Sequence, residues 1–208
     1  MANDTFFKRL KHNFPHYFRR IVSWALCALS KSKPSREIVE IMLPRMADIL
    51  RSVDDDDVLG YVCHTLLVLT TNDENIRMIF NKNIHPHLIQ LLNHTEEKLV
   101  FQALQLLGQF ISEESDMVDA LIDAGLMIHL KRLLEHYPSL KFRKELCWIL
   151  SNIAAGPDEH KQLILDMEFL PIISSFIDSV MEFEVLIYIG DLLDNLNDTG
   201  SATLILYE

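Results

Sequence analysis

A repeat of about 42 residues is the feature that most restricts how this chain can fold. Four segments align on a shared apolar pattern: 43–50, 85–92, 127–134 and 170–177. Their second positions are Pro44, Pro86, Ile128 and Pro171, at intervals of 42, 42 and 43 residues. Proline is tolerated in the first turn of a helix, where its missing N–H costs no hydrogen bond. Each segment therefore predicts the start of a helix.

Further helices are expected on both sides of these segments. The short helices that precede them are expected at 76–80, 118–122 and 162–165, after acidic or polar residues that favour helix N-termini. Longer apolar helices follow at 58–69, 99–111, 142–154 and 183–193, and one more is expected at 18–29. No stretch alternates apolar and polar residues in the way of a strand. One short and two longer helices per period match the size of an armadillo or HEAT unit.

The predicted fold is all-α: a right-handed superhelical armadillo solenoid with about four full repeats and an N-terminal partial repeat. Each unit must stack on its neighbours, because it cannot bury its apolar face alone. We expect a single solenoid over 1–208, divided at 1–33, 34–74, 75–116, 117–157 and 158–197, with a tail at 198–208. Both ends lack polar caps, which indicates a cut through a longer array or surfaces for self-association.

Composition restricts the class of partner. The chain has 49% hydrophobic residues, enough for a substantial core, and a formal net charge of −11. An acidic protein is a poor binder of nucleic acid and a reasonable binder of basic peptides. No apolar run is long enough for a membrane span, and the N-terminus lacks the apolar core of a secretion signal.

Three other patterns indicate structure, without catalysis, cofactor or metal. Cys27, Cys63 and Cys147 lie in apolar helical runs without C-x-x-C spacing, so we interpret them as reduced core residues of an intracellular protein. The acidic run 54–57 is expected in a solvated turn at a helix N-terminus. The histidines at 85, 87 and 94 lack companions at zinc-site spacing. No catalytic motif is present, so an enzyme is not expected.

The segment 144–156 carries the strongest functional signal. As a helix it places Glu145, Trp148 and Asn152 on one face. The opposite face is apolar: Leu146, Cys147, Leu150 and Ile153. Read by itself, the pattern fits either a buried tryptophan capped by polar neighbours or a surface that holds an extended basic peptide.

Aligning the long helices extends this face into three columns. The first column contains Trp24, His64, Gln105, Trp148 and Ile187. Four residues later stand Ala28, Val68, Gln109, Asn152 and Asp191, and three residues earlier Ile21, Tyr61, Gln102, Glu145 and Glu184. Tryptophan can sandwich the stem of Lys or Arg, an amide can bond a peptide backbone, and carboxylates can receive cationic heads.

Several stretches resemble the importin-alpha (karyopherin-alpha) family, the armadillo adaptors that read nuclear localisation signals. The resemblance is carried by 24–29, 102–108, 119–125 and 144–156, and it corresponds to the middle and later repeats of that family. It implies peptide-binding roles for seven residues: Trp148, Asn152, Glu145, Glu184, Trp24, Gln109 and Ser151. The implied activity is protein import into the nucleus, with the protein in both cytoplasm and nucleus.

The chain departs from that family at most columns. Only Trp148 and Asn152 keep the full Trp–Asn pair, while Trp24 has lost its asparagine to Ala28. The basic importin-beta-binding segment of the family has no counterpart. The run 8–11 could be mistaken for it, but by register 15–20 belongs to a helix of the first partial repeat, so an importin-beta partner is doubtful. The alternatives are therefore a degenerate paralogue that serves as a protein-interaction scaffold, or a fragment of a longer array.

Overall fold

The computed structural model describes residues 16–32, 34–112, 115–137, 139–177 and 182–197. In these residues it contains twelve helices and no strand. The chain divides into two compact units, Met1–Phe110 and Ile111–Glu208. The prediction of one solenoid with the stated repeat boundaries stays a prediction, and its tail at 198–208 and the basic run 8–11 lie outside the described residues.

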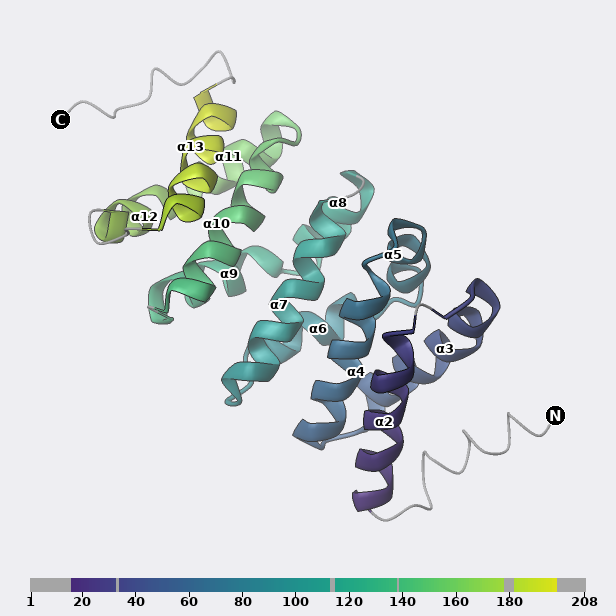
Figure 1. Ribbon diagram of the computed structural model, residues 1–208. Coiled ribbons are helices and arrows are strands. Elements are labelled where there is room, and N and C mark those ends of the chain that lie inside the picture. Colours follow the sequence, from purple (N-terminus) through teal and green to yellow (C-terminus); the bar gives the residue numbers. More distant parts are fainter. Residues whose placement is uncertain (1–15, 33, 113–114, 138, 178–181, 198–208) are drawn as a thin grey trace. The chain divides into compact units, whose positions relative to one another are not determined.

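Within the part of the first unit that the structure describes there are six helices, which are labelled in Figure 1. They are α2 (His16–Ser30), α3 (Arg36–Ser52), α4 (Asp56–Leu69), α5 (Asp73–Phe80), α6 (His85–Leu91) and α7 (Glu97–Ile111). Helix α2 packs along α4, and α3 packs against α4 and α5. Apolar side chains such as Leu43, Leu66 and Ile76 are fully buried between these helices. Their burial holds the helices together, because apolar area removed from water is the main favourable contribution to folding.

The second unit also has six helices. They are α8 (Ser115–Asp123), α9 (Leu126–His136), α10 (Leu140–Ala154), α11 (Asp158–Asp166), α12 (Phe169–Ile177) and α13 (Phe183–Asn197). Helix α10 lies at the centre: it packs along α13 over much of its length and also contacts α9 and α11 (Figure 1). Phe142 and Phe169 are fully buried in this unit. Because α9, α11 and α13 all pack against α10, only part of its surface remains exposed.

The five long helices predicted from the apolar pattern are all present, as α2, α4, α7, α10 and α13. Helices α6, α9 and α12 begin close to their anchors, with Pro86, Ile128 and Pro171 in the first turn. Gly125, directly before α9, has φ = +86°, a left-handed conformation that glycine adopts without a steric penalty.

The prediction for Pro44 is wrong. It does not begin a helix but lies inside α3, which starts two turns earlier at Arg36. Proline removes one backbone hydrogen bond from a helix interior and usually bends or breaks it. Here the buried face of α3 continues through the proline, with Val39 and Leu43 before it and Met46 after it. Apolar packing on both sides therefore outweighs the local cost.

Two other expectations concern the acidic run and the cysteines. The run lies at a helix N-terminus as predicted, but Asp55 is buried where a solvated turn was expected. Asp55 caps α4 by accepting a hydrogen bond from the backbone N–H of Val58, with Asp56 and Asp57 in the first turn. Cys27, Cys63 and Cys147 are free and buried, and burial raises the pKa of both Cys63 and Cys147 to about 12. These thiols are packing groups.

The described residues contain neither a candidate membrane span nor a candidate metal site. No helix there has the length and apolar character needed to cross a membrane. No group of three histidine, cysteine or acidic residues in the same part of the chain could hold a metal ion.

Candidate functional site

Helix α10 has the two faces that its sequence predicts. Leu146, Cys147, Leu150 and Ile153 are fully buried. Glu145, Trp148 and Asn152 are each partly exposed and follow one another at helical spacing. Trp148 is intermediate in exposure, so it is neither a fully exposed residue nor one of the buried core residues of α10. An aromatic ring, an amide and a carboxylate share one side of a rigid helix.

Glu145 is the electrostatically unusual member of this face. Burial raises its pKa to about 7, and the positive charge of neighbouring Lys144 opposes that shift only in part. A carboxylate removed from water is costly unless a counter-charge or hydrogen bonds replace its hydration. A cation arriving beside Glu145 would supply that counter-charge.

Asn152 is also incompletely satisfied. Its Nδ2 atom is buried and has no hydrogen-bond partner among the described residues. Because this atom is buried, the Asn152 side chain must turn outward before it can donate to a backbone carbonyl of a partner, but it loses no internal hydrogen bond in doing so. The face thus offers one hydrogen-bond donor and one carboxylate on either side of Trp148.

Helix α13 lies beside this face and alters two of the candidate residues. Glu184 forms an ion pair with Lys144 of the same chain, so the chain itself already supplies a cation to that carboxylate. Asn195 donates from Nδ2 to the carbonyl of Ser151, at 3.1 Å. These contacts tie α10 to α13 across about forty residues of sequence.

Ser151 is not part of the exposed face. It is buried, and its hydroxyl donates to the carbonyl of Trp148 at 2.8 Å. Its carbonyl is the group that Asn195 occupies. The structure therefore separates Ser151 from Trp148 and Asn152, with which the resemblance had grouped it. Gln109 is half-buried on α7 and makes contacts of its own.

Trp24 belongs to a different environment, a pocket of about 910 Å³ in the first unit. Helices α2, α4 and α7 and the residues just outside them line it. Trp24 is 57% exposed, and Tyr61 and His64 are half-buried on α4. Gln102 on α7 completes the floor, and its Oε1 is buried without a partner among the described residues. Members of two of the three columns thus meet here, with different chemistry from α10: Trp24 and His64 from the first column, and Tyr61 and Gln102 from the column three residues earlier.

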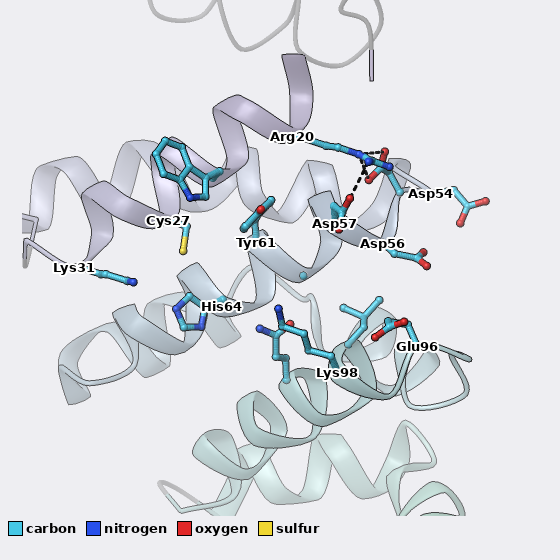
Figure 2. Close-up of a pocket in the computed structure, with 15 residues that line it drawn as sticks. Arg20, Cys27, Lys31, Asp54, Asp56, Asp57, Tyr61, His64, Glu96 and Lys98 are labelled. Atoms are coloured by element: carbon cyan, nitrogen blue, oxygen red, sulfur yellow. Dashed lines mark hydrogen bonds and ion pairs between the residues drawn. The ribbon is translucent and has the colours of Figure 1, made fainter. Parts of the chain in front are cut away.

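Cationic and acidic side chains both line this pocket, and Lys31 and His64 lie apart from the cluster of Arg20 and the aspartates (Figure 2). Arg20 pairs with Asp55 through Nε at 3.1 Å and with Asp57 through Nη1 at 2.8 Å. The hydrogen bond to Asp55 raises the pKa of Arg20. Lys31, His64 and Lys98 also line the pocket, and burial together with the two lysines lowers the pKa of His64.

This second cluster was not predicted from the sequence, because only tryptophan, amide and carboxylate side chains were considered as peptide-binding groups. One signal was available: Lys98 lies in the first turn of α7, where a cation opposes the positive end of the helix dipole. A local rule broken in this way is a reason to look for function.

Comparisons with known proteins show similarity to armadillo-repeat proteins. The family described as Armadillo/beta-catenin-like repeat matches residues 114–155. "Importin subunit alpha-1a" of Oryza sativa subsp. japonica is 29% identical over 71% of this chain and 28% of its own length. "Importin subunit alpha-2" of the same organism is 29% identical over 80% of this chain and 33% of its own length. The chain thus spans about a third or less of these relatives.

Solved structures share the fold at low sequence identity. A designed armadillo repeat protein in complex with the peptide (KR)4 has a TM-score of 0.75 at 21% identity, covering 92% of this chain and 80% of that one. A second designed armadillo repeat protein has a TM-score of 0.78 at 19% identity, covering 92% and 81%. The all-α armadillo fold predicted from the repeat is confirmed.

Proposed function

We propose that this chain, which has the armadillo fold and is similar to importin alpha subunits, is an adaptor in protein import into the nucleus. In this proposal it acts in cytoplasm and nucleus without enzymatic activity, and the exposed face of α10 binds a basic segment of an imported protein. The observation that carries the proposal is the shared face of Glu145, Trp148 and Asn152.

Each group on that face has a separate task. Trp148 packs against the methylene stem of a lysine or arginine and attracts its cationic head, a contact of about 0.5–2 kcal/mol. The Nδ2 group of Asn152 donates to a backbone carbonyl of the extended segment and fills its own vacant bond. Glu145 receives the cationic head and ionises as it does so.

Glu184 contributes by exchange. Its present partner is Lys144, and both side chains are partly exposed. Exposed ion pairs contribute little to stability, about 0–1 kcal/mol, so a cation from the bound segment can replace Lys144 at low cost. Trp24 and Gln109 remain candidates for a separate stretch of the same partner.

Fluorescence anisotropy with a labelled lysine-rich and arginine-rich peptide tests the proposal. Binding should weaken with added salt, and Trp148→Ala should reduce affinity about threefold to thirtyfold, the equivalent of one cation–π contact. Ile128→Ala, at an exposed position on α9, is the matched control and should bind like wild type. Binding that ignores salt, or that is the same in Trp148→Ala, would exclude the α10 face.

A second candidate is a protein-interaction scaffold that no longer carries import cargo. It is favoured by the column position on α13, where Ile187 is an exposed aliphatic side chain instead of an aromatic one. A photo-crosslinker placed at Ile187 distinguishes the two. Crosslinks to one non-basic partner would support the scaffold, whereas crosslinks to many basic nuclear proteins would contradict it.

A further inference from the structure

The pocket of the first unit has a cationic end that the proposed basic-peptide site does not use. Lys31 follows directly after the last residue of α2, His64 lies in the middle of α4, and Lys98 is the second residue of α7. Three separate helices thus bring these side chains to one pocket. In Figure 2, Lys31 and His64 lie on the left, whereas Arg20 and the aspartates lie on the right.

The electrostatics agree with this shared placement around one pocket. After burial, Lys31 and Lys98 are the causes that lower the pKa of His64, so both positive charges act on the same imidazole. Within the residues that the structure describes, neither lysine has an ion-pair partner, although five acidic residues line the same pocket.

Three of those acidic residues have partners of their own. Asp55 and Asp57 pair with Arg20, and Asp56 lies 3.4 Å from Nε2 of His94. Both lysines are exposed, so an anion that enters this part of the pocket can pair with them without first displacing a carboxylate of the protein.

We propose that this cationic end binds the anionic side chain of an extended peptide, whose neighbouring residues lie over Trp24 and Tyr61. Lys31 and Lys98 supply charge-assisted hydrogen bonds, and the imidazole of His64 supplies a further N–H. Trp24 and the half-buried ring of Tyr61 provide flat apolar area for the rest of the segment. The anion can be the carboxylate of Asp or Glu, or the phosphate of a modified Ser, since both present several acceptor oxygens.

This inference is independent of the basic-peptide site. It concerns the first unit and the opposite charge, so the failure of one leaves the other standing. Asp54 and Glu96 also line this pocket and can receive a cation. A segment that carries an anionic residue and a separate basic residue therefore matches the pocket better than a uniformly basic segment.

The test uses the full chain and three labelled peptides that differ at one central position: serine, glutamate or phosphoserine. Each carries a lysine near one end. We expect the glutamate peptide to bind several-fold more tightly than the serine peptide, and phosphoserine roughly tenfold or more, because hydrogen bonds between charged groups are the stronger ones. The preference should shrink with added salt.

Matched variants assign the effect to the pocket. The double variant Lys31→Gln/Lys98→Gln should remove the preference for an anion, whereas Lys131→Gln on α9, at another partly exposed lysine, should keep it. Trp24→Ala should weaken all three peptides by a similar factor. Lys98→Glu should bind a fourth peptide, whose central residue is lysine, more tightly than the glutamate peptide.

Each outcome decides the inference. A preference for either or both anionic peptides that disappears in the double lysine variant supports it, and the stronger of the two identifies carboxylate or phosphate as the natural ligand. Equal affinities for all three peptides, or a preference that survives in the double variant, would overturn it. Trp148→Ala should leave the preference unchanged, which separates this site from the α10 face.

Discussion

Equivalent positions of the repeat have different side chains and different partners in the two units. In the second unit, α10 and α13 are tied by Lys144–Glu184 and by Asn195 on the Ser151 carbonyl. In the first unit, α2, α4 and α7 line a pocket of about 910 Å³ that contains both acidic and cationic side chains.

A single column shows how this difference arises. The position of Glu145 on α10 is held by Tyr61 on α4 and by Gln102 on α7. The same position of the repeat thus carries a carboxylate in the second unit and neutral polar groups in the first. A repeat fold can therefore change its ligand without changing its core, because the buried positions of each helix are not the ones that vary in charge.

The largest effect should come from Glu145. Its pKa is raised from an ordinary value near 4.5 to about 7, so its contribution to stability is fully present below the unfolded pKa and is lost as pH rises through 7. Glu145→Gln should therefore unfold less readily than wild type at pH 8, by up to about 3 kcal/mol, and like wild type near pH 4.5.

Urea unfolding followed by tryptophan fluorescence measures this effect in the second unit. The chain has two tryptophans, so Trp24→Phe leaves Trp148 as the reporter. Glu184→Gln, at an exposed ion pair, is the control and should change stability by less than about 1 kcal/mol. Parallel pH profiles for wild type and Glu145→Gln would show that the carboxyl group is not desolvated.

A glycine pair gives the next largest effect. A Cβ at Gly156 would lie 2.8 Å from Nδ1 of His160, a buried ring held by Asp119, and 3.1 Å from the carbonyl of Ile153. Gly156→Ala should cost about 1–3 kcal/mol, because overpacking forces neighbours to move. Gly190→Ala on α13 meets no atom within 4 Å and should stabilise by up to about 1 kcal/mol. Thermal unfolding of both variants checks the pair, and equal shifts would contradict it.

Asp55 tests the first unit. It caps α4 and accepts from Arg20 in a buried position, so Asp55→Ala should cost about 1–2 kcal/mol, the usual cost of losing a cap. Asp54→Ala, at the exposed neighbour, should stay within about 0.5 kcal/mol of wild type. Trp24 fluorescence in the Trp148→Phe background measures both, and indistinguishable midpoints would disprove the capping role.

Lys144 should have the smallest effect on stability and a clear one on binding. Lys144→Met removes an exposed ion pair, so the free energy of unfolding should change by less than about 1 kcal/mol. Affinity for a basic peptide should rise a few-fold at pH 8, since Glu184 becomes available and a like charge is removed. Lys131→Met, measured by the same anisotropy titration, controls for net charge. An unchanged affinity would indicate that Glu184 takes no part in binding.

Much of this could be predicted locally. The apolar spacing predicted all five long helices, the acidic run predicted the start of α4, and the helical positions of Glu145, Trp148 and Asn152 predicted their common face. Each depends on residues within a few turns of one another. Pro44 failed for the opposite reason: local preference favoured a helix start, and the buried face of α3 overrode it.

The sequence by itself determined a helical repeat, the buried side of each long helix, and a candidate face on α10. Only the tertiary structure decided which polar groups remain available on those faces. Lys144 and Glu184 are forty residues apart, as are the elements that bring Lys31 and Lys98 to His64, and such pairs have no signal in local spacing. The physical reason is that burial and charge pairing are properties of neighbours in space. Helix periodicity orients a side chain, and packing against another helix sets its pKa and its partner.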